Sequence, residues 1–516
     1  MKRTNDTAFG SRRSAFIPFR QTVADDIPGL PAVPVIPMPV MHQAVQPGTP
    51  SVNRSRADSQ TAVIGPQNLP VVVARPASSV ADKSEVDAFR KTLHRAIRAG
   101  DHDTVESLLQ HEAADEIAMA IDQGGKNALC CAIECQNLQS VRRLLRLASA
   151  SEQAMRCTAN GDYPLMHATR RGMISVVQLL LGLSSAREQL AQYNELGLCP
   201  PLVAACLGEP EVLNLMVETD AKTLFAKMKG GFNPLHLAAG LGRLPVVDYL
   251  ISSPHGAALA EAKTENGANA LHVAAVTGHL SVVDYLIRSP HGAALVEEKS
   301  REGFNALHLA AVMGHQPVVD YLIRSPYGAA LVEAKTEKGS NALHVAAGQG
   351  HLPVVDYLIG SPRGAALVAA KTEKGSNALH LAAQNGHLPV IEYLLSSLHG
   401  AALVGAKAEK NANALHMAAQ NGHLPVVDYL MRSPYGAALA EATTQQSCNA
   451  LHLSAGKGHL NVVQYLLKSP RAADLAKQQV KDGRDALQIA SSYGHHEVVR
   501  VLKASGLFET SSANKE

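Results

Sequence analysis

Histidine is the residue type in this chain with the clearest capacity for chemistry, because imidazole binds metals and carries protons. The chain of 516 residues contains 23 histidines, and fifteen of them recur at a fixed spacing. One set occupies the same position in successive units, which follow each other at 36 residues apart from one step of 34. Its members are His94, His236, His272, His308, His344, His380, His416 and His452, and three units between His94 and His236 have another residue there. A second set follows a glycine in the same rhythm: His279, His315, His351, His387, His423, His459 and His495.

This periodicity argues against a metal centre. A metal ion needs several ligands that converge at about 2 Å. Each set supplies one histidine per unit, and stacked helical units lie about 10 Å apart. We therefore expect no metal site and no cofactor.

The cysteines give a second possible centre, since Cys131 and Cys135 lie one helical turn apart beside Cys130. All three occupy apolar positions of the repeat, so we expect buried, inert thiols. Seven cysteines with two adjacent ones make a poor disulfide framework. Free thiols in a reducing compartment are the expected state.

Sequence motifs for catalysis are missing as well. The GKG at Gly456–Gly458 has no preceding glycine at the spacing of a phosphate-binding loop. Neither a nucleophile elbow nor an HExxH segment occurs. The sequence therefore predicts no catalytic residue, and we expect the chain not to be an enzyme.

An internal repeat must position all of these residues. The stretch Ser325–Gly360 and the next 36 residues, Ser361–Ser396, differ at only nine positions. Extended in both directions, the same alignment gives about twelve units, with one step of 34 residues between Leu202 and His236. Such periods are typical of solenoids, whose terminal units diverge because one face meets water.

The sequence pattern within one unit predicts two short helices. In Gly267–Ser289, apolar residues recur at helical spacing in two runs, and Gly278 separates the runs. Several units begin the second run with a proline, as at Pro353, where its missing N–H is harmless. Helices of about two turns are unstable alone. We expect two antiparallel helices and a longer loop, stabilised by packing on the neighbouring units.

The phrases NPLHLAAGLGRLPVVDYLI and NALHLAAQNGHLPVIEYLL resemble the ankyrin repeat over about residues 89–505. The resemblance implies an all-α solenoid of about twelve helix–turn–helix units and no enzymatic activity. It also implies that the chain binds a protein on the concave side, formed by the turns and first helices. In this family the first set of histidines is structural.

Two departures from the family pattern matter. Asparagine replaces the family's threonine before the first helix in most units, as at Asn269 and Asn341, and asparagine also caps helices. The unit is three residues longer than the common 33, and the extra length falls in the loop PHGAALVEAKTEKG. We expect AALVEAK to add a helical turn there.

Candidate partner-binding residues are those that vary between units while their surroundings do not. They close the first helix or follow the turn, and apolar ones would anchor a partner most strongly. Drift at solvent-exposed positions would give the same variation. The selected residues are Phe232, Leu241, Phe304, Val312, Met313, Gln349, Gln384, Asn385, Gln420 and Asn421.

Residues 1–85 differ from the repeats. Pro28, Pro31, Pro34 and Pro37 follow three-residue spacing, which places them on one edge of a polyproline II helix. The segment would then be a ligand for SH3-type domains, or else an extended linker. We expect a disordered arm over 1–85, the repeat domain over 86–505 and a flexible tail over 506–516.

The charge and hydropathy of the chain narrow the classes of partner that we expect. A formal net charge of +2 gives no field for nucleic acid, and no apolar run is long enough to span a bilayer. The overall layout resembles bacterial ankyrin-repeat effectors secreted by a type III system, with an uncleaved Ser/Pro/Arg-containing start. That resemblance implies a monomer that enters the host cell cytoplasm and binds a host protein there. The alternative is a cytoplasmic scaffold that acts in its own cell.

Overall fold

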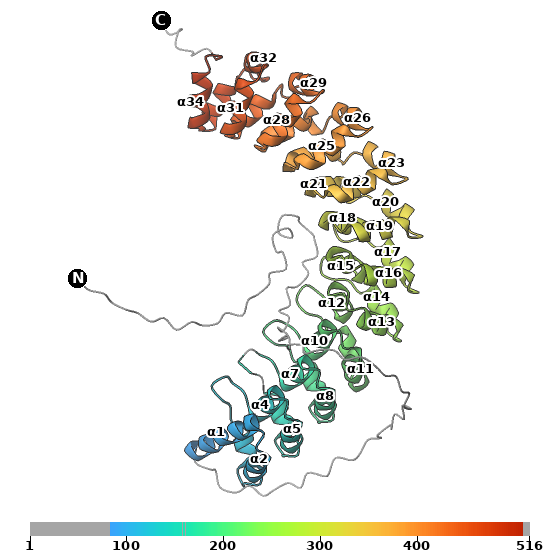
Figure 1. The fold of residues 1–516 in the computed structure, drawn as a ribbon, viewed down its shortest axis with the longest axis vertical. Helices are drawn as coiled ribbons and strands as arrows, with labels where there is room; N and C mark the ends of the chain where they lie inside the picture. Colours follow the sequence, from blue (N-terminus) through green and yellow to red (C-terminus); the bar gives the residue numbers. More distant parts are fainter. Residues whose placement is uncertain (1–82, 157, 160, 509–516) are drawn as a thin grey trace, which may run out of the picture. The chain divides into compact units, whose positions relative to one another are not determined.

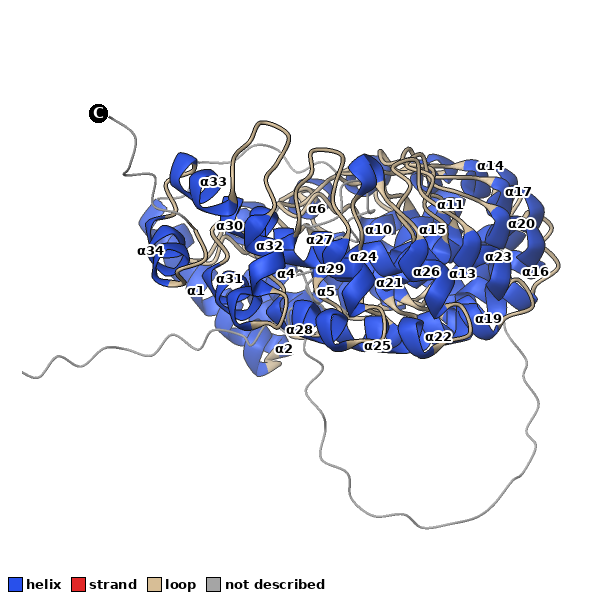
Figure 2. Ribbon diagram, turned by 90° about the horizontal axis from the view of Figure 1, so that it is seen from above, coloured by secondary structure: helices blue, strands red, loops and turns tan. Residues whose placement is uncertain are grey.

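The computed structural model describes residues 83–156, 158–159 and 161–508. The predicted arm lies outside the described residues except for its last three, which begin the first helix, and only 506–508 of the predicted tail are described. The described residues form two compact units, which divide between Lys229 and Gly230. Throughout the described residues the secondary structure is helix and loop, without a strand (Figure 2). The predicted all-α class is confirmed.

The first unit contains four repeats. Their first helices are α1 (Lys83–Ala99), α4 (Ala128–Glu134), α7 (Pro164–Arg170) and α10 (Pro200–Leu207). Their second helices are α2 (His102–Leu109), α5 (Leu138–Leu144), α8 (Ile174–Leu181) and α11 (Pro210–Thr219). A third short element follows each pair: α3 (Ala114–Met119), α6 (Ala150–Ala154), α9 (Ala186–Leu190) and the 3₁₀ helix η1 (Ala221–Phe225).

The second unit contains eight repeats, which with the four above makes the predicted twelve. Their first helices are α12 (Pro234–Gly240), α15 (Ala270–Thr277), α18 (Ala306–Met313), α21 (Ala342–Gln349), α24 (Ala378–Asn385), α27 (Ala414–Gln420), α30 (Ala450–Gly456) and α33 (Ala486–Ser492). Their second helices are α13 (Leu244–Ser252), α16 (Leu280–Arg288), α19 (Gln316–Arg324), α22 (Leu352–Gly360), α25 (Leu388–Ser396), α28 (Leu424–Arg432), α31 (Leu460–Lys468) and α34 (His496–Ala504).

The second unit also has a third helix in all but its last repeat, and these helices run along the convex side of the curve while α12, α15, α18 and α21 follow the concave side (Figure 1). The third helices are α14 (Gly256–Glu261), α17 (Gly292–Glu297), α20 (Gly328–Glu333), α23 (Gly364–Ala369), α26 (Gly400–Gly405), α29 (Gly436–Glu441) and α32 (Ala472–Lys477). A 3₁₀ turn, η2 (Glu409–Asn411), lies in one loop.

The third helix is the predicted extra turn, and it recurs in ten of the twelve described repeats. Leu331 and Val332 in α20 are buried, so the helix adds apolar packing to the unit. Gly328 begins it, and a Cβ there would overlap the carbonyl oxygen of Ile323. Where the sequence step shortens to 34 residues, the 3₁₀ helix η1 replaces this α-helix. A 3₁₀ helix spans the same gap with fewer residues because its rise per residue is greater.

The capping asparagines behave as predicted and also hold the repeat together. The Asn341 side chain accepts a hydrogen bond from the His344 backbone N–H at 2.9 Å, and His344 Nδ1 accepts one from the Asn341 N–H at 3.2 Å. Asn341 Nδ2 also donates to the carbonyl oxygen of Leu367 in the third helix, at 3.0 Å. Both residues are buried. The same cap recurs from His236 to His452, so these seven histidines of the first set are structural. His94, the other member of the set, lies inside α1 and caps no helix start.

The second set of histidines joins neighbouring repeats. His315 Nε2 lies 2.9 Å from the carbonyl oxygen of Val276, 39 residues earlier, and the same contact recurs at 2.7–3.1 Å from His279 to His495. The His315 ring lies against Gly278, where a Cβ would come within 2.6 Å of Nδ1. Gly278 also has a φ of +78°, so two independent constraints require glycine there.

A column of tyrosines links the second helices. Tyr285 Oη donates to Asp248 at 2.6 Å, and Tyr393 Oη donates to Asp356 at the same distance. Each pair connects one second helix to the preceding one, so the column adds polar contacts to the apolar stack. Every helix between residues 83 and 508 is too short or too polar to cross a lipid bilayer.

Candidate partner-binding groove

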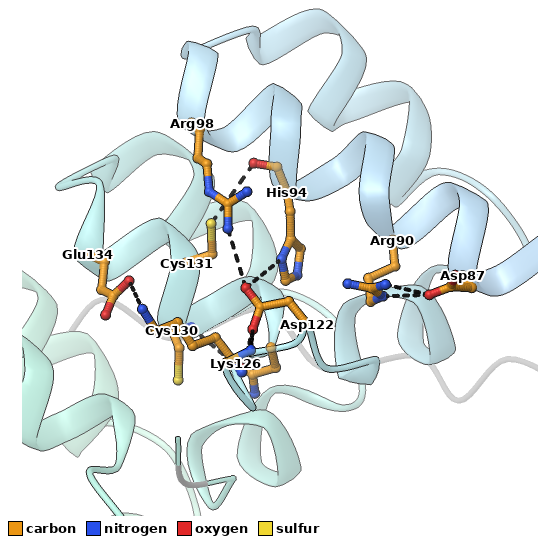
Figure 3. A network of polar contacts seen from close by, with 11 residues as sticks. Asp87, Arg90, His94, Arg98, Asp122, Lys126, Cys130, Cys131 and Glu134 are labelled. Atoms are coloured by element: carbon orange, nitrogen blue, oxygen red, sulfur yellow. Dashed lines mark hydrogen bonds and ion pairs between the residues drawn. The ribbon is translucent and has the colours of Figure 1, made fainter. Parts of the chain in front are cut away.

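The cluster of cysteines and histidine in the first unit does not form a nucleophilic centre (Figure 3). Cys131 Sγ donates to the backbone carbonyl oxygen of His94 at 3.9 Å, and its neighbour Cys130 is buried. Burial raises the pKa of both thiols to about 12. Thiols of that kind stay protonated at neutral pH and are poor nucleophiles.

The carboxylate in the same cluster organises a loop. Asp122 accepts hydrogen bonds from the backbone N–H groups of Gly124 and Lys126 at 2.9 and 3.0 Å, and Arg98 lies 3.3 Å away. His94 is buried beside it, with Nδ1 3.8 Å from Asp122 Oδ2, and burial lowers the pKa of His94 to about 4. Figure 3 also draws the ion pairs of Asp87 with Arg90 and of Lys126 with Glu134, so the cluster consists of a neutral histidine, a loop-forming aspartate and ion pairs.

In the described ranges, no group of three or more His, Cys, Asp or Glu side chains is arranged to hold a metal ion. Cys130, Cys131, Cys199 and Cys206 are buried free thiols, as predicted for the repeat positions. The prediction of burial is wrong for Cys135, which is exposed because it caps the end of α4. The described surfaces must therefore be examined for binding.

A cleft of about 720 Å³ opens at the C-terminal end of the second unit. Its walls come from the first helices α30 and α33 and from the loops that precede them, here called fingers. The lining residues are Gln420, Gln446, Cys448, His452, Leu453, Gly456, Lys457, Val480, Lys481, Asp482, Arg484, Ile489, Tyr493 and His495.

This cleft identifies one continuous face, which we call the groove face. Because the repeats are related by a shift of 36 residues, the counterparts of Cys448, Gly456 and Lys457 in other repeats point to the same side. All ten residues predicted from the sequence are such counterparts. Phe232 and Phe304 correspond to Cys448, three others to Gly456 and five to Lys457. The structure therefore brings the ten onto one face of the second unit.

The ten residues differ in how accessible they are. Phe232, Phe304 and Val312 are buried, with exposed fractions of 5%, 9% and 1%. Leu241, Met313 and Gln349 are half-buried. The remaining four are exposed: Gln384, Asn385, Gln420 and Asn421. That these residues bind a partner stays a prediction, but the three buried ones have almost no surface to offer as the groove stands.

The sequence analysis missed the row of apolar residues at the middle of the first helices. Leu237, Val273 and Leu309 are buried. Their counterparts in the next four repeats, here called the open row, are half-buried: Val345, Leu381, Met417 and Leu453. The counterpart in the last repeat, Ile489, is buried again. Leu453 lines the cleft, so the open row forms an apolar floor along the groove face.

This difference follows the size of the residue at the position of Cys448 in each finger, here called the fingertip. Each row residue lies between the fingertips of its own repeat and the next, as Leu453 lies with Cys448 and Arg484 in the cleft. For each of the three buried row residues, one of the two flanking fingertips is a phenylalanine, either Phe232 or Phe304. The first three residues of the open row have only serine, alanine or cysteine there. Accessible row residues thus occur where the fingertips are small, and that pattern is readable in the sequence.

Three consecutive fingers beside the open row have the same net charge. The fingers 334–341, 370–377 and 406–413 each carry two lysines and one glutamate, so each has a net charge of +1. In the covered part the finger 226–233, which bears Phe232, has a net charge of +2, and the fingers 262–269 and 298–305 are each neutral. The finger 442–449, which follows the three lysine-bearing fingers, is also neutral. The open part of the groove thus has the more accessible apolar floor, and three consecutive fingers of equal positive charge line its rim.

Comparison with known proteins supports the architecture. A family model described as ankyrin repeats in three copies matches residues 77–154, 93–192, 165–259, 202–298, 255–331, 292–369, 328–406 and 415–511. A search of curated proteins finds no match. The family is a protein–protein interaction repeat and indicates no catalytic domain. With the matched segments covering most of its length, the chain belongs to the ankyrin-repeat family.

Proposed function

We propose that the chain is a non-enzymatic monomer that binds a protein partner through the groove face of its second unit. The observation that carries this proposal is the open row, which leaves four half-buried apolar side chains along a rigid helical floor. Apolar contacts of this kind supply most interface energy. The floor belongs to packed helices, so little conformational entropy is lost on binding.

Contact with the groove face is tested by site-specific photo-crosslinking. A crosslinking amino acid at Asn421, exposed on the groove face, is compared with one at Arg432, exposed in α28. In a lysate of candidate host cells, the full chain labelled at Asn421 should capture a discrete protein that the Arg432 variant does not capture. Capture only through Arg432, or through neither site, contradicts the proposal.

The partner's cell is a separate part of the proposal. We propose that the chain is a type III secreted effector acting in the host cytoplasm, supported by the composition of residues 1–85, nearly all of which lie outside the described residues. Fusing about 50 of the first residues to a reporter tests it, because this stretch includes the Pro-rich part of the composition on which the proposal rests. Retention of the reporter inside the bacterium would leave the intracellular scaffold as the better hypothesis.

A further inference from the structure

We infer that the open groove takes an extended, acidic peptide segment with an apolar side chain at every third residue. This inference rests on the proposed function and specifies the partner's chemistry. It draws on three properties of the region between α21 and α30: the spacing of the floor, the charge of one rim and the amides of the other.

The spacing of the floor selects the conformation of the bound segment. Neighbouring first helices lie about 8–10 Å apart, which sets the distance between successive members of the open row. A polyproline II segment rises about 3.1 Å per residue with three residues per turn, so one edge repeats about every 9.3 Å. Every third side chain of such a segment therefore meets one row residue. A β-strand fails this match, because its side chains alternate between two faces.

The fingers supply a fixed row of positive charge. Lys338, Lys374 and Lys410 occupy the position of Gln446, which lines the cleft. All three side chains are exposed. Lys374 pairs only with an exposed glutamate, Glu409, at 3.7 Å, and no ion pair between described residues involves the other two.

Backbone hydrogen bonds hold these lysines in register. The carbonyl oxygen of Lys338 accepts from the N–H of Glu373 in the next finger at 3.1 Å. The carbonyl oxygens of Lys374 and Lys410 accept from the fingers that follow them at 2.6 Å. The positive rim is thus tied to the repeat spacing of the floor, and carboxylates at every third residue of a bound segment would match it.

The opposite rim suits an extended backbone. Gln384 and Gln420 are exposed at the ends of α24 and α27, and their side-chain amides have no hydrogen-bond partner among the described residues. A polyproline II segment has no internal hydrogen bonds, so its carbonyl groups need donors. Amide side chains can donate and accept along such a backbone.

Nucleic acid fits this surface less well than an acidic peptide. Glu337, Glu373 and Glu409 alternate with the lysines and would repel a continuous phosphate backbone. The floor is aliphatic, whereas single-stranded nucleic acid stacks on aromatic rings. The chain's own proline-rich segment has the right spacing at Leu30, Val33 and Ile36 but no acidic residue between Ile27 and Pro50. These two occupants are outcomes of the test.

The test uses synthetic fluorescent peptides and the full chain. The main probe contains four consecutive Leu-Pro-Glu triplets, one for each residue of the open row. Its controls are a Leu-Pro-Lys peptide, a shuffled peptide of the same composition, a peptide copying residues 27–40 and a single-stranded oligonucleotide. Fluorescence anisotropy should give a Kd of about 1–100 µM for the main probe, weakening with salt, and at least about tenfold weaker binding for each control.

Matched charge reversals test the rim. The variant Lys338→Glu/Lys374→Glu/Lys410→Glu should lose at least about tenfold in affinity for the acidic probe. The variant Lys468→Glu/Lys477→Glu/Lys503→Glu changes three exposed lysines outside the cleft by the same total charge and should bind within about twofold of the parent chain. Circular dichroism confirms that both variants are folded.

Several results would overturn the inference. Equal binding of the Leu-Pro-Lys peptide would show that negative charge is not required, and equal binding of the shuffled peptide would show that the spacing is not required. Equal binding of the acidic probe by the rim variant would show that the peptide binds elsewhere. Preferential binding of the 27–40 peptide or the oligonucleotide would assign a different occupant. If Asn421 still captures a protein while the acidic probe does not bind, only this inference fails; if both fail, the proposed function fails with it.

Discussion

The two parts of the groove face share one backbone design and differ in what covers it. In the covered part, residues 230–313, Phe232 and Phe304 occupy fingertips and the central row is buried. In the open part, residues 338–457, the fingertips are small and the row is half-buried. The framework residues are the same in both, for example the capping Asn269 and Asn377. A repeat protein can therefore change its binding surface without changing the contacts that keep it folded.

The largest expected effect comes from removing one aromatic fingertip. Phe304→Ala should lower the free energy of unfolding by about 3 kcal/mol, because a buried ring is replaced by a cavity. Ser376→Ala, at the same position of the open part, should change it by less than about 0.5 kcal/mol. Urea denaturation, with hydrogen exchange of α18 and α24, measures both. Similar losses for the two variants would contradict the distinction between covered and open parts.

The capping asparagines should be equally important in both parts. Asn269→Ala and Asn377→Ala each remove a helix cap and a buried hydrogen bond at 2.8 Å to a third helix. A loss of about 2–3 kcal/mol is expected for each. Parallel denaturation curves measure the two variants. A difference above about 1 kcal/mol would show that the frameworks are not equivalent.

The capping histidines predict acid sensitivity. Burial lowers the pKa of His308 to about 3 and that of His380 to about 4, against an ordinary value of 6.5. As pH falls below about 6.5, the unfolded chain binds protons that the folded chain cannot, so stability is lost until about pH 4. Each histidine contributes up to about 1.4 kcal/mol per pH unit in this window.

Glutamine is a suitable replacement for this test. Gln488 occupies the same position in the last repeat and keeps the capping box with Asp485. His308→Gln and His380→Gln should each flatten the dependence of stability on pH between about 6.5 and 4 by one histidine's share. Unchanged slopes in both variants would mean that these histidines do not titrate with unfolding.

The smallest effect is expected at the exposed amides. Gln384→Ala and Asn421→Ala should each change stability by less than about 0.5 kcal/mol, because both side chains are exposed. Binding of a groove partner should nevertheless weaken by about twofold to tenfold. Thermal melting and anisotropy with the same peptide separate the two quantities. A large loss of stability would place these residues in the framework.

The sequence predicted the framework because the framework repeats. Asn341 and His344 recur every 36 residues, and a residue required by the same local geometry in every unit is visible by comparing units. The 36-residue step also indicated an additional helical turn, and the structure contains it as α20 and its counterparts. Variation, in contrast, had two meanings: Phe304 is a variable residue that the structure buries, whereas Gln384 is a variable residue at an exposed helix end.

The order of residues by itself determined the repeat, its caps, its glycine turns and the family, since these depend on contacts within a unit or between adjacent copies. Only the tertiary structure decided which apolar residues remain accessible. Leu309 and Leu381 are the same residue type at the same repeat position, yet one is buried and the other is not. The fingertips on either side of these two residues differ in size, and one of each pair belongs to the next repeat, so exposure is a property of the assembled surface.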